Sequence, residues 1–234
     1  MEDFINFLNQ NNIDYDNDKL NKLEKYYKIL VEYNQKVNLT AITDKHDVYI
    51  KHFADSLLGL EYIQEDATVC DIGTGAGFPG IVLKIFKPNI KLYLVDSVNK
   101  KIEFLDYLIK ELDLDNINTI HARVEDKEFK DKYLNYFDIV TARAVANIGT
   151  LTEYCLPFVK IGGKFIAYKT NEINNELNNN YQHIIEQLGG SSYSIFYKKL
   201  DNYAERSFVF VEKSANTSNK FPRGLNKPRI SPLK

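Results

Sequence analysis

The chain has 234 residues, of which 44% are hydrophobic and 26% charged, a balance ordinary for one globular domain or a compact core with an extension. The net charge of -2 does not by itself indicate a nucleic-acid partner. No apolar run approaches the roughly 20 residues of a membrane span, and the polar, acidic start predicts no secretory signal, so we expect a cytoplasmic protein. Cys70 and Cys155 are expected as buried thiols in a reducing compartment, and we predict no metal site.

The first 65 residues predict a helical extension. Residues 18–37 place apolar side chains at helical spacing, and Asp18 can cap their start. Residues 46–60 repeat the pattern, and within them we expect His52 to make a structural hydrogen bond near Asp55 rather than to act as a base. We therefore divide the chain into a helical extension, 1–65, a main domain, 66–213, and a basic tail, 214–234.

After the extension, strands alternate with helices. Strand-type apolar runs occupy 68–72, 91–95, 117–121, 137–142 and 164–168, and helical runs occupy 98–112, 145–158 and 172–188. This alternation predicts an α/β fold, a parallel sheet with helices on both faces.

The end of the sheet differs from its beginning. Residues 192–200 and 205–213 both have strand patterns, and only "DNYA" separates them. That connection is too short for a crossover helix, so the two strands must be antiparallel neighbours. We predict a mainly parallel, seven-stranded sheet that ends in an antiparallel hairpin. Such an ending is unusual for dinucleotide dehydrogenases and expected for methyltransferases that use S-adenosylmethionine.

A glycine-rich turn follows the first strand of this sheet. The stretch "ATVCDIGTGAGFPGIVLKIF", 67–86, joins a buried strand to a helix that Pro79 can start. The turn therefore lies at the carboxyl end of a parallel strand, where open α/β sheets bind ligands. No G-K-[ST] follows, which excludes a nucleoside-triphosphate P-loop.

Two acids narrow the choice of ligand. Asp96 ends the second strand, where a carboxylate accepts hydrogen bonds from ribose hydroxyls, so we expect an adenosine cofactor. Asp71 precedes the glycines, and a carboxylate there would repel a pyrophosphate but suit an α-ammonium and a sulfonium. With the terminal hairpin, these acids favour S-adenosylmethionine over a nicotinamide dinucleotide. We take Asp71, Gly73, Gly75, Gly77 and Asp96 as cofactor-binding residues.

Several motifs resemble one known family. "DIGTGAGFPG", "VDSVNKKIEFL", "HARVED" and "DIVTARAVA", with "NQKVNLTAI" and "KHFADSL" upstream, strongly resemble ribosomal RNA small subunit methyltransferase G, also called glucose-inhibited division protein B. The resemblance covers about residues 25–213. It implies a class I methyltransferase fold, Rossmann-like, and transfer of a methyl group from S-adenosylmethionine to N7 of one guanine in the 530 loop of 16S rRNA.

The resemblance also implies roles for individual residues. The implied cofactor contacts are Gly73, Phe78, Val124, Glu125 and Arg143. The implied functional arginines are Arg123, Arg143 and Arg206, which we take as catalytic and substrate-binding. Lys100 falls on a basic family position that would also bind the substrate.

The residues fit this chemistry. Guanine N7 carries a lone pair and no proton, so its methylation needs orientation and charge stabilisation rather than a general base. "TARA" follows the fourth strand, where amine methyltransferases carry N/D-P-P-Y and pyrimidine C5 enzymes a Pro-Cys pair. A guanidinium there can donate to guanine O6 or clamp a phosphate, which leaves N7 free. For Arg206, pairing with Glu205 is the alternative.

The tail and the partners are less defined by the sequence. From residue 213 onward the charged residues are all basic: Lys213, Lys220, Arg223, Lys227, Arg229 and Lys234. Charge alone favours a solvated, disordered terminus, and the alternative is an arm for a polyanion, in which Arg223 binds substrate. We expect a monomer that acts on 16S rRNA within the 30S subunit or an assembly intermediate. The alternatives are a non-catalytic RNA-binding or ribosome-assembly factor and a methyltransferase for a small molecule or protein.

Overall fold

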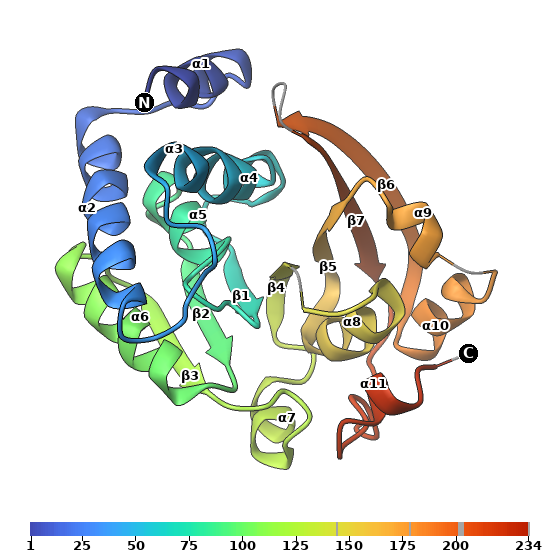
Figure 1. The fold of residues 1–234 in the computed structure, drawn as a ribbon. Helices are drawn as coiled ribbons and strands as arrows, with labels where there is room; N and C mark the ends of the chain where they lie inside the picture. Colours follow the sequence, from blue (N-terminus) through green and yellow to red (C-terminus); the bar gives the residue numbers. More distant parts are fainter. Residues whose placement is uncertain (144, 178, 201–203, 234) are drawn as a thin grey trace.

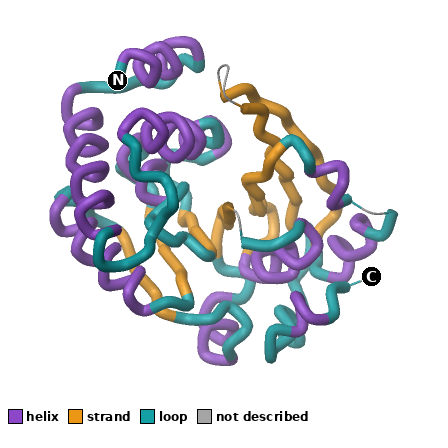
Figure 2. The backbone as a smooth tube through the Cα atoms, in the orientation of Figure 1, coloured by secondary structure: helices purple, strands orange, loops and turns teal. Residues whose placement is uncertain are grey.

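A central sheet organises the chain, with helices packed against both of its faces (Figures 1 and 2). The computed structural model describes residues 1–143, 145–177, 179–200 and 204–233. Within them the strands are β1 (Thr68–Ile72), β2 (Lys91–Asp96), β3 (Ile117–His121), β4 (Phe137–Arg143), β5 (Val159–Thr170), β6 (Gly190–Leu200) and β7 (Ala204–Lys213). The α-helices are α1 (Glu2–Gln10), α2 (Asn17–Asn34), α3 (Lys45–Val48), α4 (Asp55–Leu57), α5 (Gly80–Phe86), α6 (Asn99–Glu111), α7 (Lys127–Tyr133), α8 (Ile148–Cys155), α9 (Ile173–Glu176), α10 (Tyr181–Gln187) and α11 (Lys227–Ile230).

The strand order is β3-β2-β1-β4-β5-β7-β6. The first five strands pair in parallel, and β7 pairs antiparallel with both β5 and β6. This arrangement confirms the predicted class, a mainly parallel sheet that ends in an antiparallel hairpin, although residues 201–203 of the hairpin connection lie outside the described residues. The chain runs from β1 outward to β3 and returns to β4 on the other side of β1, so the loops diverge at the carboxyl ends of β1 and β4. That switch point is the expected ligand crevice.

Neighbouring residues of each central strand enter different cores. Val69 of β1 and Leu94 of β2 pack in one hydrophobic cluster, and Cys70 and Val95 pack in the other. This alternation follows from the two-residue period of a strand, whose successive side chains point to opposite faces. The thiols of Cys70 and Cys155 are both fully buried and unpaired, as expected from the sequence.

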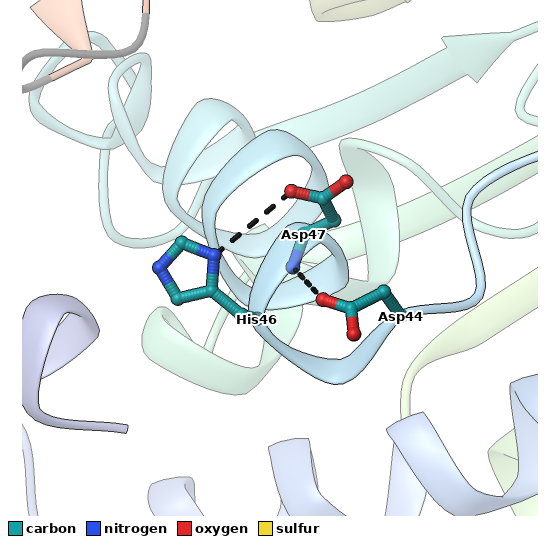
Figure 3. A group of neighbouring side chains, drawn as sticks. All are labelled: Asp44, His46 and Asp47. Carbon is teal, nitrogen blue, oxygen red and sulfur yellow. Dashed lines mark hydrogen bonds and ion pairs between the residues drawn. The ribbon is translucent and has the colours of Figure 1, made fainter.

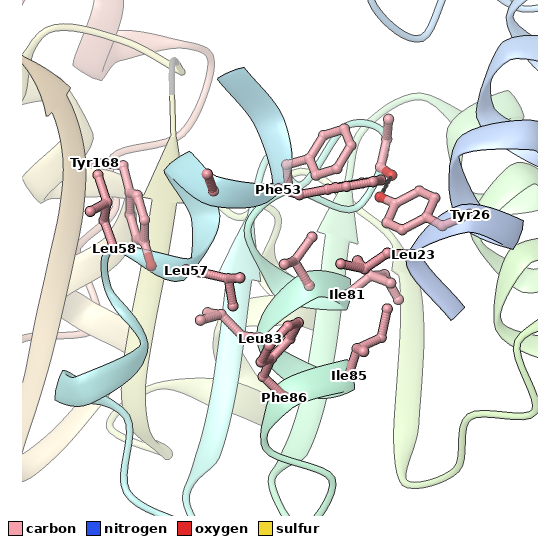
Figure 4. Close-up of a cluster of buried hydrophobic side chains, with 14 of the residues drawn as sticks. Leu23, Tyr26, Phe53, Leu57, Leu58, Ile81, Leu83, Ile85, Phe86 and Tyr168 are labelled. Carbon is pink, nitrogen blue, oxygen red and sulfur yellow. Dashed lines mark hydrogen bonds between the residues drawn. The ribbon is translucent and has the colours of Figure 1, made fainter. Parts of the chain in front are cut away.

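The N-terminal helices share the core of the sheet. Helix α2 contacts α5 and α6, and Figure 4 shows Leu23 and Tyr26 of α2 next to Ile81 of α5 and Phe53. The Tyr26 hydroxyl also donates a hydrogen bond to the carbonyl of Ala76, within the glycine-rich turn. The helical extension therefore supports the turn directly.

The helix predicted over 46–60 is interrupted by a π-helical segment, Tyr49–Ala54, between α3 and α4. Hydrophobic periodicity does not distinguish a π turn from an α turn, because their backbone hydrogen bonds differ in span by only one residue. The helix predicted over 172–188 is instead two short helices, α9 and α10. The asparagine-rich segment between them favours turns, which explains the break.

The basic tail is folded, in contrast to the disordered terminus that charge alone favoured. Residues 214–233 include α11 and pack along α8, with Phe221 and Pro228 buried. Arg223 pairs with Glu153, a fully buried carboxylate of α8. A count of charges along the chain could not predict this packing, because the acidic partner lies 70 residues away.

Candidate functional site

The glycine-rich turn joins β1 to α5 in a left-handed conformation. Gly73, Gly75 and Gly77 have φ angles of 69°, 60° and 98°, which disfavour residues with a Cβ atom. A Cβ atom on Gly73 would also lie 2.6 Å from Cγ2 of Val145, in the loop after β4. Glycine at position 73 therefore allows the loops after β1 and β4 to approach each other at the switch point.

Asp71 lies beneath this turn. Its Oδ2 accepts hydrogen bonds from the Thr74 hydroxyl (2.7 Å) and the Gly80 amide (3.0 Å), and its Oδ1 accepts one from the Thr141 hydroxyl (3.0 Å). Burial raises the pKa of this carboxyl group, and the hydrogen bonds oppose that rise. The side chain is fully buried and is not among the residues that line the nearby cavity, so we assign it to supporting the turn.

A cavity of about 450 Å³ opens at the carboxyl ends of the central strands, within the usual size range of small-molecule sites. The lining residues are Ile72, Gly73, Val95, Asp96, Ser97, Val98, Lys101, Ala122, Arg123, Val124, Glu125, Val145, Tyr154, Asn226 and Arg229. Five of the predicted site residues are in this lining: Gly73, Asp96, Arg123, Val124 and Glu125. The predicted residues that lie outside it are Asp71, Gly75, Gly77, Phe78, Lys100, Arg143, Arg206 and Arg223.

Asp96 is suited to bind a ribose. Its Oδ2 accepts a hydrogen bond from the Gly75 amide and its Oδ1 accepts one from the Val98 amide, both at 3.0 Å. Lys101 lies 3.5 Å from Oδ2. Each carboxylate oxygen has a second lone pair, so these contacts orient Asp96 without using up its capacity to accept hydrogen bonds. The residues present therefore fit an adenosine cofactor.

Arg123 and Glu125 pair at the edge of the cavity. Nε and Nη2 of Arg123 donate to Oε1 of Glu125 at 2.9 and 2.6 Å, and this pairing raises the pKa of the Arg123 guanidinium. Half of the Arg123 side chain is exposed, and the Glu125 side chain is nearly buried. The pair therefore presents an oriented cation at the mouth of the cavity.

A second group of side chains, which includes two of the arginines predicted to be functional, centres on Asp55. Nη1 of Arg143 donates to its Oδ2 at 2.8 Å, and Nε of Arg206 donates to its Oδ1 at 2.5 Å. Arg206 thus forms an ion pair with Asp55. Its neighbour Glu205 is the alternative partner considered from the sequence. Sequence reasoning did not identify Asp55 as a site residue, although it lies in the motif "KHFADSL".

His52 adjoins the same arginine. Its Nε2 lies 2.9 Å from the Thr40 hydroxyl, and its Nδ1 lies 3.3 Å from Nη2 of Arg143. Arg143 can only donate, so Nδ1 accepts and we assign the proton to Nε2. Burial, together with the Arg143 charge, lowers the pKa of His52 to about 4, so the ring is neutral near pH 7. The histidine therefore has the structural role that we expected.

Phe78 lies between the turn and these side chains. Its ring stacks on His52 with centroids 4.5 Å apart and on Tyr26 with centroids 5.3 Å apart. The guanidinium of Arg143 lies over the same ring, 5.1 Å from its centroid. Phe78 therefore supports Arg143 from the side of the turn.

Two further residues predicted to bind substrate lie elsewhere. Lys100 is exposed on α6, next to the cavity residue Lys101. Arg223 donates through its backbone N, Nε and Nη2 to the two carboxylate oxygens of Glu153, at 3.0, 2.8 and 2.7 Å. The guanidinium of Arg223 is therefore engaged within the fold.

One group of the described residues brings possible metal ligands together at the surface. Ligand atoms of Asp44, His46 and Asp47 lie within 4.8 Å of one another (Figure 3). Asp44 accepts a hydrogen bond from the Asp47 amide at the start of α3, and His46 contacts Asp3 and Asp47. These contacts explain the group as a helix cap with adjacent ion pairs, and we assign it no metal.

None of the helices within the described residues is long and apolar enough to span a membrane.

Comparisons with known proteins identify the family of this chain. Residues 19–203 match the sequence model of the family described as rRNA small subunit methyltransferase G. Curated relatives named ribosomal RNA small subunit methyltransferase G are 44% identical over 229 residues in Staphylococcus epidermidis and 40% identical over 235 residues in Exiguobacterium sibiricum. These alignments cover 97% of this chain and 95% of the first relative, and 99% and 98% for the second.

Solved structures share the fold at low sequence identity. A putative S-adenosylmethionine-dependent methyltransferase of Methanococcus maripaludis is similar with a TM-score of 0.55 at 17% identity, over 81% of this chain and 93% of that chain. The M. jannaschii TYW2 in complex with AdoMet is similar with a TM-score of 0.52 at 18% identity, over 67% and 74% of the two chains. These structures share the fold of this chain, and their descriptions name the cofactor that the sequence predicts, S-adenosylmethionine.

Proposed function

The chain belongs to the rRNA small subunit methyltransferase G family, and on this premise we propose that it methylates N7 of one guanine in the 530 loop of 16S rRNA. Methylation of small-subunit rRNA with S-adenosylmethionine comes with the family. The target atom and its position in the rRNA are the proposal.

The observation that supports the proposal is that neighbouring donors hold the carboxylates of the cavity lining within the described residues. Among the described residues that line it, the carboxylates are Asp96 and Glu125. Asp96 accepts hydrogen bonds from two backbone amides, and Glu125 accepts two hydrogen bonds from Arg123. Asp55 binds two arginines, and the neutral ring of His52 uses both nitrogens. A site supplied with cations and engaged acids suits guanine N7, which has no proton to remove.

The bound cofactor supplies an electrophilic methyl group on a sulfonium. The chain must hold the base beside it, and we assign this task to Arg143 with Arg206 and Arg123. Arg143 ends β4, two residues before Val145, which lines the cavity. A guanidinium held there can donate to guanine O6 or to a phosphate without blocking N7. Orientation of this kind, rather than proton transfer, is then the contribution of the protein to the rate.

The proposed substrate is rRNA presented by the 30S subunit or an assembly intermediate, with the protein acting as a monomer in the cytoplasm. A net charge of -2 does not support tight binding to RNA through phosphates alone. Recognition of an already folded RNA–protein surface would supply the missing affinity and specificity. Equal methylation rates on naked 16S rRNA and on 30S subunits would contradict this part of the proposal.

The test is methyl transfer with mapping of the product. The protein is incubated with labelled S-adenosylmethionine and 30S subunits from cells that lack it, and the modified nucleoside is located by mass spectrometry. We expect 7-methylguanosine at one position in the 530 loop, and loss of transfer with Arg143→Ala while calorimetry still detects cofactor binding. A methyl group on another atom or nucleoside would refute the proposal. Cofactor binding without any transfer to RNA would favour the non-catalytic assembly factor.

A further inference from the structure

We propose that the segment formed by residues 221–231 is the outer wall of the cofactor cavity and that Asn226 and Arg229 hold the adenosine half of the bound S-adenosylmethionine. The inference rests on the S-adenosylmethionine-dependent function proposed above and adds residues to its cofactor site. Both side chains line the same cavity as Gly73 and Asp96, although they lie in the basic tail, far along the chain.

The wall is tied to the main domain on the cavity side. The Tyr154 hydroxyl of α8 donates to Oδ1 of Asn226 at 3.2 Å, and Nη2 of Arg229 donates to the carbonyl oxygen of Val145 at 2.8 Å. Tyr154 and Val145 line the cavity themselves. The same side chains that face the cavity therefore connect α11 to α8 and to the loop after β4.

The contact with Val145 links the wall to the glycine-rich turn. Cγ2 of Val145 lies 2.6 Å from the position that a Cβ atom on Gly73 would occupy, so the β4 loop covers the first glycine closely. Arg229 donates to the carbonyl oxygen of the same residue, Val145, and so contacts this loop as well. The C-terminal segment thus completes an enclosure that the turn and the β4 loop begin.

Side chains of α8 in the main domain bind the segment of residues 221–231 directly. Glu153 is fully buried on α8, and Arg223 supplies three hydrogen bonds to its carboxylate. The Thr150 hydroxyl, one turn away on α8, donates to the carbonyl of Pro228 at 2.8 Å. A carboxylate buried without its cation is strongly destabilising, so Glu153 is tolerated in α8 only because the segment is bound there.

The neighbours of Tyr154 indicate which half of the cofactor the wall faces. Tyr154 of α8 lines the same cavity as Asp96 and the residues from Ala122 to Glu125. Burial raises the pKa of the Tyr154 phenol, the Glu125 charge adds to the rise, and the charges of Arg229 and Arg123 lower it. Tyr154, Asn226 and Arg229 thus share the cavity with Asp96, and we assign them to the adenosine that Asp96 would bind through its ribose.

Calorimetry on the full-length protein tests the inference with two ligands, S-adenosylmethionine and 5′-methylthioadenosine, which lacks the amino-acid half. The variants are Arg229→Ala and Asn226→Gly, because glycine tolerates the φ angle of 58° at position 226. We expect roughly tenfold weaker binding of both ligands for each variant, the usual effect of removing a charged or polar contact. The matched control is Lys227→Ala, an exposed residue of the same helix outside the lining, which should bind both ligands like the wild type.

Each outcome decides a separate point. Unchanged affinity for S-adenosylmethionine in both variants, with wild-type melting temperatures, would refute the proposal that residues 221–231 form a wall of the cofactor cavity. Weaker binding of S-adenosylmethionine but not of 5′-methylthioadenosine would overturn the assignment to the adenosine half. If the wild-type protein bound neither ligand, the cofactor site itself would be refuted. If it bound both but methylated no rRNA, the proposed function would fail while the wall remained supported by the variants.

Discussion

Arg143 donates a hydrogen bond from Nη1 to Oδ2 of Asp55 at 2.8 Å, and this contact joins residues 88 positions apart in the sequence. Asp55 is almost fully buried at the end of the π-helical segment, and Arg143 ends β4. The N-terminal helices thereby orient an arginine of the sheet. Since Asp55 binds Arg206 with its other oxygen, one carboxylate sets the positions of two arginines.

Asp55→Asn should lower the rate of methyl transfer without changing cofactor affinity. An amide offers one acceptor oxygen and no charge, so both arginines lose part of their support. We expect kcat to fall at least roughly tenfold. The free energy of unfolding should fall by about 3 kcal/mol, because two largely buried cations lose their counter-charge. Steady-state kinetics, calorimetry and urea unfolding measure the three quantities.

The matched control for this change is Glu205→Gln. Glu205 is an exposed carboxylate next to Arg206 and was the partner considered from the sequence. The variant Glu205→Gln should leave kcat and the free energy of unfolding unchanged. A larger loss of activity in Glu205→Gln than in Asp55→Asn would show that Arg206 depends on the neighbouring strand residue instead.

His52 should make the protein less stable as the pH falls. Its pKa is about 4 in the folded protein and about 6.5 in an unfolded chain. Above pH 6.5 the ring is neutral in both states, and between pH 6.5 and 4 only the unfolded state binds the proton. The free energy of unfolding therefore falls on acidification, by about 2 kcal/mol at pH 5 from this group.

Urea unfolding at pH 7.5 and pH 5.0 measures this effect. The variant His52→Gln should lose about 2 kcal/mol less between the two values than the wild type, because its side chain does not titrate. His183→Gln, which changes an exposed histidine of α10, should behave like the wild type. An equal loss of stability in His52→Gln and the wild type would contradict the assignment.

Gly73→Ala should weaken cofactor binding through the loop after β4. Alanine must adopt a φ angle of 69°, and its Cβ atom would collide with Val145. Moving Val145 opens the switch point, so we expect affinity for S-adenosylmethionine to fall more than roughly tenfold in calorimetry. Gly162→Ala is a matched control, because that glycine also has a positive φ, 82°, but no atom within 4 Å of its Cβ position. Gly162→Ala should lower the free energy of unfolding by about 1 kcal/mol and leave the cofactor affinity unchanged. If Gly162→Ala and Gly73→Ala lost affinity equally, backbone strain rather than contact with Val145 would explain the effect.

Arg223→Ala should destabilise the protein through Glu153. The change removes the guanidinium that donates two hydrogen bonds to a fully buried carboxylate and leaves only the bond from the backbone N–H of residue 223. We expect a loss of about 3 kcal/mol in urea unfolding. The double variant Glu153→Leu with Arg223→Met should recover most of it, because an apolar pair replaces the buried ions. No change in stability with Arg223→Ala would restore the possibility that Arg223 serves mainly to bind RNA.

The sequence predicted the parts of this protein that depend on local chemistry. The alternation of strands and helices predicted the sheet, and the short link after residue 200 predicted the terminal hairpin. The glycines and Asp96 predicted an adenosine site at the end of β1. The predictions of the sheet and the hairpin are confirmed, because periodicity and loop length are properties of short segments.

Tertiary structure decided the partners of the charged side chains. Nothing within "KHFADSL" shows that Asp55 will bind two arginines from β4 and β7, and nothing in the basic tail shows that Arg223 will bury Glu153. The same packing places Asn226 and Arg229 at the cavity and directs Asp71 beneath the turn. An ion pair depends on distance in space and on exclusion of water, and neither quantity is a property of one segment of chain. The sequence therefore determined the fold and predicted the class of cofactor, and the folded structure determined which side chains lie together at the cavity.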